Sequence, residues 1–454
     1  MATVLGANSV TGGYDVDNSV RLDGYDSSSR MEYTASNASN RRTWTWSAWI
    51  KRSDKRTNNF QVLFSSTPTG PAERIMFEGD KLTYDHDKAG TDFSVSTPGV
   101  LRDFSAWYHV VVMKDTTQST ETNRIKIYVN GVQQTLVEVQ EGFPGQNLES
   151  TINTAAETQL FAQGDGEEFG GYACEVVFCD GQSLAADSFG EFDSDSGIWK
   201  PIDVSGLTFG TNGFYLDFED SGNLGNDANG GTDFTEVNLA AADQATDTCT
   251  NNFATANPLA NLKGAPAFAQ GNLEIIGDNS ANHNWQSTIG VSSGKWYWEM
   301  KSLASSPDTA LVFYDQSIAP VNSMGAGFST SGRLKIVNNA AGGSAIGSTA
   351  QNDIHGMALD LDNGKMFIHR NGTYIESGDP ANGTNPFIET SDGLETEGVI
   401  GGFVYDGTVQ INFGGCPAFA ISSGNADGNG FGNFEYAVPS GYLALCTKNL
   451  AENG

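Results

Sequence analysis

Apolar and polar residues alternate in many short runs along the chain. In the run Thr43–Arg52, Trp44 and Ala48 fall on one face while Thr45 and Trp49 fall on the other. A period of two is that of a β-strand, whose successive side chains point to opposite faces of a sheet. Further runs of this kind are found at Trp107–Asp115, Arg124–Val137, Tyr172–Phe192, Gly294–Leu303, Gly356–Ser377 and Val409–Gly415. The pattern predicts an all-β chain.

Turn signals separate these runs. Asn130-Gly131, Asn363-Gly364 and Asn371-Gly372 each stand between two apolar runs, and both residues of such a pair tolerate positive φ. We therefore expect a hairpin at each of them. A short helical turn is expected around Leu184–Phe189, and no amphipathic helix is found elsewhere.

The spacing of strands and turns predicts two antiparallel β-sandwiches in tandem. Residues 1–19 are small and polar and are expected to form an arm. Residues 20–192 form the first sandwich and residues 263–454 the second. Between them, residues 193–262 are rich in Gly, Asn, Asp and Thr and are interpreted as a connector with one or two strands. A length of 454 residues fits two or three domains.

The charge excludes several classes of partner. The chain has 24 Lys and Arg against 55 Asp and Glu, a formal net charge of −31. Such a surface repels phosphate backbones and anionic lipids, so we expect no nucleic-acid binding. No run approaches the length of a membrane span, so no membrane insertion is expected, and no secretory signal is visible at the amino terminus.

The five cysteines have neither an even count nor close pairs, so they predict neither a disulfide framework nor a zinc site. Cys174 and Cys179 lie in one expected strand, and their odd separation places them on opposite faces. All five are interpreted as reduced and mostly buried.

Acidic residues and glycines alternate between residues 217 and 234, as in loops that wrap calcium. Asp217, Asp220, Asp227 and Asp233 could supply carboxylate ligands. However, an EF-hand that starts at Asp217 has Ala228 where a glutamate is required. Turns in which Asp side chains bond their own backbone are the first interpretation, and calcium is the second.

No catalytic constellation is recognised. Glu191 and Asp193 have the spacing of the first two carboxylates of an ExDxxE glucanase strand, but Ser196 replaces the third. His109 stands in an alternating strand and is interpreted as a packed or hydrogen-bonded residue. Asp85, His86 and Asp87 are interpreted as a hairpin tip, and the five histidines are scattered. We expect a protein without enzymatic activity.

Glycan binding usually needs exposed aromatic rings beside carboxylates and amides. In the second unit this mixture occurs at Trp285, at Tyr314 with Asp315, and at Tyr405 with Asp406. These five residues are the candidate ligand contacts, with a core position as the alternative for each aromatic.

Both units resemble known families. The first resembles the laminin-G-like, concanavalin A-type lectin/glucanase sandwich, and the other is similar to a SPRY domain, a related bent double sheet. The motifs of the first are TWTWSAWIKR, WYHVVVMKD, IKIYVNGV and GGYACEVVFCDGQSL; those of the other are GKWYWEM, GMALDLDNGKMFIHRNGTY, INFGG and PSGYLALC. The resemblance implies jelly-roll sandwiches that bind partners, but both folds host many roles.

The order of the two units, with the connector between them, resembles structural proteins of tailed, marine-type bacteriophages. That implies a virion surface protein, made in the host cytoplasm, which contacts other virion proteins and binds host surface glycan. A tail fibre or other receptor-contacting appendage is favoured over a head decoration protein or another architectural role. A polysaccharide depolymerase is the third alternative, and a cellular carbohydrate-binding module the fourth. A homo-oligomer, with a trimer favoured, is implied by the analogy alone.

Overall fold

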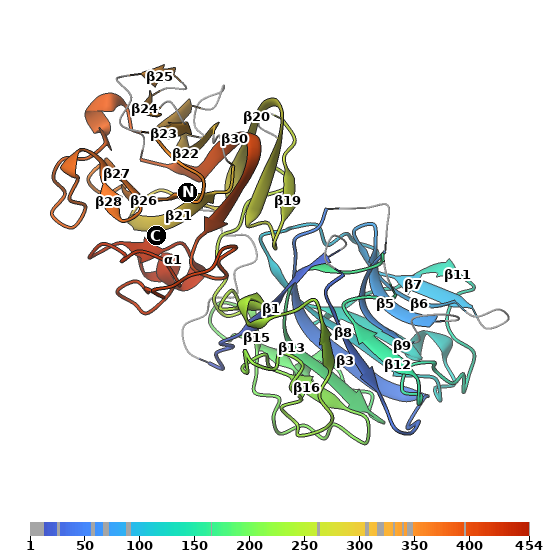
Figure 1. Cartoon of the computed structure of the whole chain (residues 1–454). Helices are drawn as coiled ribbons and strands as arrows, with labels where there is room; N and C mark the ends of the chain where they lie inside the picture. Colours follow the sequence, from blue (N-terminus) through green and yellow to red (C-terminus); the bar gives the residue numbers. More distant parts are fainter. Residues whose placement is uncertain are drawn as a thin grey trace. The chain divides into compact units, whose positions relative to one another are not determined.

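The computed structural model describes residues 13–24, 28–55, 60–66, 72–87, 92–164, 166–260, 264–304, 308–315, 322–329, 332–337, 340–342, 348–394 and 396–453. These residues divide into two compact units, one ending at Thr250 and the other beginning at Asn251. Both consist of β-strands joined by turns (Figure 1). The chain is thus all-β, with tandem antiparallel β-sandwiches, as the periodicity predicts.

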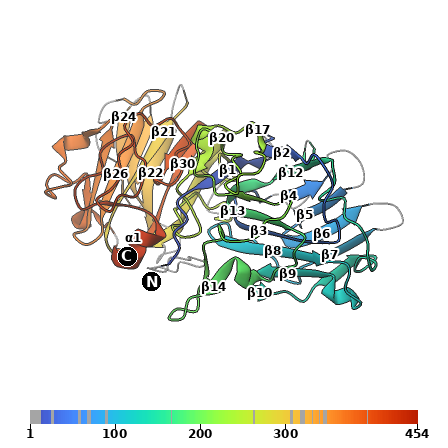
Figure 2. The ribbon, with the colours of Figure 1, turned by 90° about the horizontal axis from the view of Figure 1, so that it is seen from below.

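The described part of the first unit holds two large sheets, which we call sheet I and sheet II. Figure 2 shows β3 and β8 in one layer and β5 and β6 in the other. Sheet I has the strand order β10 (Val132–Gln133), β9 (Ile125–Val129), β8 (Trp107–Asp115), β3 (Thr43–Arg52), β13 (Gly170–Asp180), β1 (Ser19–Asp23) and β18 (Gln244–Ala245), and β16 (Phe214–Leu216) also pairs with β13. Sheet II has the order β11 (Val137–Gln140), β7 (Phe93–Ser96), β6 (Lys81–Asp87), β5 (Ala72–Glu78), β4 (Gln61–Ser66), β12 (Glu157–Leu160), β2 (Arg30–Thr34) and β17 (Thr235–Val237).

The core of the first unit lies between these sheets. Alternation along β3 places Trp44, Trp46 and Ala48 in it, and Trp44 and Ala48 thus share one face, as the sequence pattern predicts. The Trp46 ring stacks on Phe64 of β4, with ring centroids 6.0 Å apart. A fully buried aromatic side chain stabilises the fold by about 2–3 kcal/mol, so these contacts hold sheet I against sheet II.

A β-bulge changes the alternation of β13. The pairing of β13 with β3 shifts between Cys174 and Val177, and Glu175 has a positive φ of 51°. Because a bulge inserts one extra residue, Cys174 and Cys179 both lie on the face of sheet I that points away from the core. The prediction that they lie on opposite faces was therefore wrong. All five cysteines are reduced and buried.

Short elements complete the first unit. The hairpin of β9 and β10 turns at Asn130 and Gly131, whose φ values are 47° and 78°, as a two-residue turn requires. The helical turn expected near Leu184–Phe189 is a 3-10 helix. The remaining elements are β14 (Gly190–Phe192), β15 (Trp199–Pro201) and the 3-10 helices η2 (Glu121–Asn123), η3 (Ala186–Ser188) and η4 (Ala241–Asp243).

The residues interpreted as a connector take part in the sheets of the first unit. Strand β16 pairs with β13, β17 with β2 and β18 with β1. Hence a segment with few apolar runs still adds an edge to each sheet. The first unit extends to Thr250, further than the expected limit at residue 192.

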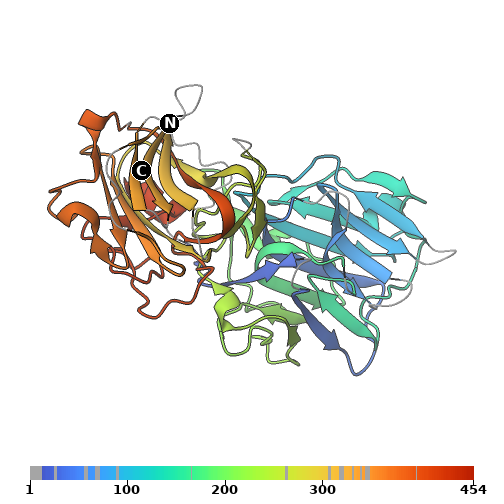
Figure 3. The same ribbon diagram turned by 45° about the horizontal axis from the view of Figure 1, so that its top comes forward.

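The second unit is built on one large, strongly curved sheet (Figure 3). Its path is β25 (Ala340–Gly342), β24 (Gly332–Val337), β23 (Asn322–Ser329), β22 (Asp308–Asp315), β30 (Gly398–Asn412), β21 (Lys295–Ser302), β26 (Ile354–Asp360), β27 (Lys365–Arg370) and β28 (Thr373–Tyr374). Off this path lie β20 (Glu274–Val291) beside β30 and β19 (Ala267–Ala269), β29 (Ile388–Glu389) beside β27, and β31 (Leu443–Ala444) in parallel beside β21. The 3-10 helices are η5 (Ile375–Ser377) and η6 (Thr390–Asp392).

Strand β21 lies at the centre of this unit. Trp296, Tyr297 and Trp298 are all fully buried, so both faces of the strand are covered. Tyr297 meets Phe434 edge to face at 5.1 Å. The chain ends in the helix α1 (Thr447–Asn453). None of the described helices is long and apolar enough to cross a lipid bilayer.

Candidate functional site

Charged residues occupy both faces of sheet II at the same place. Glu73 of β5 pairs with His86 of β6, and the next residues, Arg74 and Asp85, pair with each other. Alternation turns Glu73 and His86 towards sheet I and turns Arg74 and Asp85 outward. Two polar clusters therefore lie back to back across one sheet.

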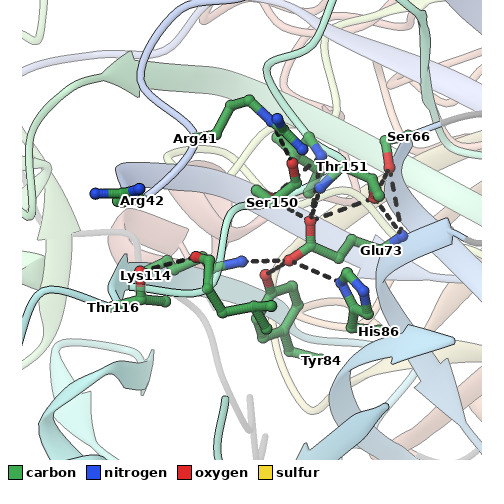
Figure 4. Close-up of polar contacts among 12 residues, drawn as sticks. Arg41, Arg42, Ser66, Glu73, Tyr84, His86, Lys114, Thr116, Ser150 and Thr151 are labelled. Atoms are coloured by element: carbon green, nitrogen blue, oxygen red, sulfur yellow. Dashed lines mark hydrogen bonds and ion pairs between the residues drawn. The ribbon is translucent and has the colours of Figure 1, made fainter. Parts of the chain in front are cut away.

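The inner group, which we call the Glu73 cluster, surrounds one carboxylate (Figure 4). Glu73 is fully buried and accepts hydrogen bonds from the Lys114 ammonium and, at 2.6 Å, from the Tyr84 hydroxyl. The Glu73 carboxylate also accepts from the Ser150 and Thr151 hydroxyls and from the backbone N–H groups of Thr151 and Ile152. The cluster thus connects β5 and β6 of sheet II with β8 of sheet I and with the turn at residues 150–152.

The Glu73 cluster keeps its charges. Burial alone raises the pKa of Glu73, but the Lys114 ammonium and the His86 imidazole outweigh burial and hold this pKa well below its usual value. The Lys114 ammonium also lies 5.7–5.9 Å from the ring centroids of Trp44, Tyr84 and Phe93, within cation–π range. With all these groups buried, the Glu73 cluster is part of the structure rather than a ligand site.

A chain of polar contacts leads from this cluster to the surface. The Arg41 guanidinium donates to the carbonyl oxygen of Ser150 at 2.7 Å. Arg41 and Arg42 both bind Glu149, at 2.8 and 3.0 Å, and the Glu149 side chain is 47% exposed. The turn at residues 149–152 is therefore held from inside by Glu73 and from outside by two arginines.

The outer group, which we call the Arg74 cluster, comprises Phe60, Arg74, Asp85 and Glu167. Arg74 forms a bidentate pair with Asp85 at 3.0 and 2.7 Å, and Glu167 lies 3.5 Å from its guanidinium. The guanidinium also stacks over the Phe60 ring, 4.9 Å from its centroid. Unlike the inner cluster it reaches solvent, since the side chains of Asp85 and Glu167 are 15% and 30% exposed.

Beside the Arg74 cluster, the turn between β12 and β13 carries acceptor oxygens without partners. Gln163 Oε1 and Glu168 Oε2 are buried and have no hydrogen-bond partner among the residues that the structure describes. Burial raises the pKa of the neighbouring Glu167, and the charge of Glu168 contributes. Unpartnered buried acceptors cost about 1–3 kcal/mol each, and a donor from a ligand or water would relieve that cost.

Ser47 and His109 lie within hydrogen-bond distance, like a catalytic serine and its base, but their contact is structural. His109 Nδ1 lies 3.0 Å from the Trp199 indole nitrogen, which can only donate, so the neutral ring carries its proton on Nε2. This proton is donated to Ser47 Oγ at 2.9 Å, and burial lowers the pKa of His109 to about 3. His109 therefore cannot serve Ser47 as a base; it is the hydrogen-bonded residue that its strand position predicts.

The segment Glu191–Ser196, which partly matches the ExDxxE strand of glucanases, lies outside both large sheets. Glu191 belongs to the small β14–β15 hairpin. Asp193 follows it and accepts hydrogen bonds from the backbone N–H groups of Asp195 and Ser196 and from the Ser196 hydroxyl. Asp193 thus closes a turn, and this pair of carboxylates does not lie on a sheet face as in a glucanase strand.

The residues predicted to contact ligand in the second unit lie in strands rather than at turns. Trp285 in β20 is fully buried, and Tyr314 in β22 is 3% exposed and donates to the carbonyl oxygen of Gly402 at 2.8 Å. A buried ring offers no face to a sugar, so both are core residues, which corrects their interpretation. The side chain of Asp315 lies outside the described part. Tyr405 is half-buried and Asp406 is exposed.

The predicted calcium ligands act as turn residues. Asp217 accepts the N–H of Glu219 at 3.1 Å, and Asp220 accepts the N–H of Gly222 at 2.9 Å. Asp227 accepts three backbone N–H groups, those of Tyr215, Asn229 and Gly231, and the N–H of Asp227 is itself bound by Asp233. Among the described residues no group of three or more His, Cys, Asp or Glu could hold a metal ion. Calcium binding at this turn stays a prediction.

Comparison with known proteins supports the fold of the first unit. A family model described as the concanavalin A-like lectin/glucanases superfamily (Laminin_G_3) matches residues 23–184, less than half of the chain. No curated protein matches the chain. The family match supports a lectin-type binding module for the first unit.

Many solved structures are similar to the chain, among them the following three. One is a heptameric SAP-like pentraxin from Limulus polyphemus, with 16% identity over 38% of this chain and 80% of that chain and a TM-score of 0.28. Another is the SPRY domain of human HERC1, with 14% identity over 36% and 99% of the two chains and a TM-score of 0.28. The third is the pair of domains LG4-5 of the mouse laminin α1 chain, with 11% identity over 96% and 100% and a TM-score of 0.31.

Proposed function

We propose that the protein is a non-catalytic binding protein and that its first unit recognises a polyhydroxylated ligand, such as a glycan, at the Arg74 cluster. The observation that carries this proposal is the stacking of the Arg74 guanidinium on Phe60 while Asp85 and Glu167 hold it. An aromatic ring, a fixed guanidinium and carboxylates within a few ångströms are the groups that recognise sugars.

The turn beside the Arg74 cluster adds the acceptors that a sugar needs. Hydroxyl groups donate one hydrogen bond and accept two. Gln163 Oε1 and Glu168 Oε2 would accept from them, and Arg74 would donate to them. A net charge of −31 disfavours polyanionic ligands, so a neutral or cationic glycan is the better partner.

A glycan array probed with the full chain tests this proposal. Gln163→Ala removes one unpartnered acceptor and should weaken binding about tenfold, the value of one hydrogen bond. Phe60→Ala should also weaken binding. The matched control is Glu191→Gln, which changes a carboxylate on the β14–β15 hairpin and should bind as the parent does. Equal affinity in all three variants, or no glycan bound by the parent, would contradict the proposal.

A finer proposal concerns where the protein works. We propose a virion surface protein of a tailed bacteriophage, in a tail fibre or other receptor-contacting appendage, that binds host glycan or another virion protein as a homo-oligomer. Its support is the resemblance of the sequence motifs and their order, together with the acidic composition. Gold-labelled antibody on purified particles should then mark tail-attached fibres.

An architectural role, such as head decoration, is the second candidate. Strand β11 forms an edge of sheet II, and its Val137 and Val139 are 42% and 52% exposed. Exposed edge strands with apolar side chains are suited to a subunit contact. Label spread evenly over the head, with no glycan affinity, would favour this candidate over the first.

A further inference from the structure

A second buried carboxyl group of the first unit, that of Glu175, has no cation beside it among the described residues. Glu175 occupies the bulge of β13, and its positive φ of 51° is rare for a residue other than glycine. The bulge turns the side chain to the outer face of sheet I, where it is 5% exposed. Strained backbone that buries an ionisable group is typical of functional positions.

The described surroundings of the Glu175 carboxyl are neutral or acidic. The Tyr215 hydroxyl of β16 lies 2.9 Å from both carboxyl oxygens. The charged groups that act most strongly on Glu175 are carboxylates that follow β15 or β16, namely Asp217, Glu219 and Asp203. The charge of Glu175 also contributes to raising the pKa of the Cys249 thiol. This thiol contacts Cys174, the residue that precedes Glu175 in β13. A carboxyl in such a place is protonated at neutral pH.

The residues before β1, Gly13–Asn18, which we call the amino-terminal segment, close over this site. The Tyr14 hydroxyl lies 3.3 Å from the Tyr215 hydroxyl, so a chain of hydroxyl groups runs from the segment to Glu175. Further along, Val16 is buried, and its N–H donates to Thr250 Oγ1 at 3.0 Å. The same hydroxyl donates to the Val16 carbonyl oxygen at 3.0 Å. The segment is thus attached to the first unit by specific hydrogen bonds at Tyr14 and Val16.

We propose that Glu175, Tyr215 and Tyr14 form a pH-sensitive latch, which holds the amino-terminal segment on the first unit while Glu175 is protonated and releases it when Glu175 ionises.

The driving force is solvation of the carboxylate. An ionised Glu175 would lie among three other carboxylates and without water, which is costly in a buried position. Removing Tyr14 from Tyr215 would open this side of the site to water and relieve that cost. Deprotonation therefore favours the open segment, and the closed segment favours protonated Glu175, since the two equilibria are linked.

Hydrogen exchange of the Val16 amide in the full chain measures the latch, because this N–H is bonded only while the segment is docked. Burial and the neighbouring carboxylates raise the pKa of Glu175 to about 8, from an ordinary value near 4.5. After correction for the intrinsic exchange rate, the opening equilibrium should rise by up to about tenfold per pH unit between pH 5 and 8 and level off above pH 8. Amides of β3, which exchange by unfolding of the unit, should be protected far more strongly at every pH.

Variants separate the latch from a merely structural contact. Glu175→Gln should abolish the pH dependence of the Val16 amide, and the matched control Glu121→Gln, an exposed carboxylate of η2, should retain it. Should Glu175→Gln fail to fold, Tyr14→Phe serves instead: it removes the terminal hydroxyl of the segment and should lower protection at every pH with the slope retained. The proposal would be overturned if the opening equilibrium measured at the Val16 amide did not change with pH, or if the Val16 amide were protected as strongly as the amides of β3.

Discussion

Glu73 and Glu175 are both buried carboxyl groups of the first unit, yet their pKa values are shifted in opposite directions. Burial raises the pKa of each. At Glu73 the Lys114 ammonium and His86 reverse the effect, whereas at Glu175 the hydrogen bond from the Tyr215 hydroxyl lowers the pKa without reversing it. Thus the presence of a cation, rather than burial, decides which protonation state the fold holds.

The positions of the two groups fit this difference. Glu73 lies between the sheets and binds β8 and the turn at residues 150–152, so its charge is satisfied from three sides. Glu175 is turned away from the core by a bulge and faces a small segment near the amino terminus. A buried charge with all its hydrogen bonds made rigidifies its surroundings. A buried carboxyl group without a counter-charge instead leaves a protonation equilibrium that a change of pH can shift.

The largest expected effect comes from breaking the Glu73 cluster. Glu73→Gln leaves the Lys114 ammonium buried without a counter-charge and weakens the anchor of the turn at residues 150–152. We expect the free energy of unfolding of the first unit to fall by about 3–5 kcal/mol. Urea unfolding read out by hydrogen exchange in β3 and β5 reports this unit separately from the second.

A double-mutant cycle tests whether the unpaired charge of Lys114 causes this loss of stability. Replacing both partners, Glu73→Met with Lys114→Met, removes the uncompensated charge and should cost less than the sum of the single replacements. Additive losses would show that the two side chains act independently, and the contrast with Glu175 would lose its basis.

The second prediction is that the two carboxyl groups give opposite pH dependences of stability. The pKa of Glu73 is lowered on folding, so its contribution is present above about pH 4.5 and is lost as the pH falls through the folded value. The pKa of Glu175 is raised to about 8, so its contribution is complete below about pH 4.5 and is lost as the pH rises to 8. Between pH 5 and 8 the Glu175 term should lower stability by roughly 1.4 kcal/mol per unit.

The same urea experiment at several pH values measures these slopes. Glu175→Gln should remove the Glu175 term, so that the difference between parent and variant grows from pH 5 to 8 and is constant above it. For Glu73→Gln the difference should change only in acid. Parallel pH profiles for the parent and Glu175→Gln would mean that Glu175 is already ionised when folded.

Much of the fold follows from local pattern. The core positions Trp44, Trp46 and Ala48 obey a period of two, and Asn130-Gly131 turns with positive φ at both residues. The bulge at Glu175 could not be predicted, because nothing local makes a glutamate adopt a left-handed conformation; the pairing of β13 with two neighbours does. Likewise the strands of residues 214–245 are stabilised as sheet edges rather than by their own apolar runs.

The candidate sites were harder to predict. Trp285 has polar neighbours in sequence, but β20 pairs along β30 and buries the indole. The sequence did contain a sign that Glu73 is buried, because Glu73 shares its strand face with the core residues Ile75 and Phe77. A glutamate at a core position of one strand needs a lysine such as Lys114 at a core position of another. That pairing becomes visible only when the two strands are known to face each other.

The smallest expected effect on the free energy of unfolding comes from Glu149, an exposed carboxylate that can be compared with the buried Glu73. Glu149 binds Arg41 and Arg42 just outside the turn that Glu73 holds, but its side chain is 47% exposed. Water and salt screen such pairs, so Glu149→Gln should change the free energy of unfolding by no more than about 0.5 kcal/mol, and less at high salt. The charge lost is the same as in Glu73→Gln and the turn is the same, so the ratio of the two effects isolates the consequence of burial. A loss above about 2 kcal/mol would mean that the arginines, rather than the buried carboxylate, hold the turn, and Arg41→Met should then reproduce it.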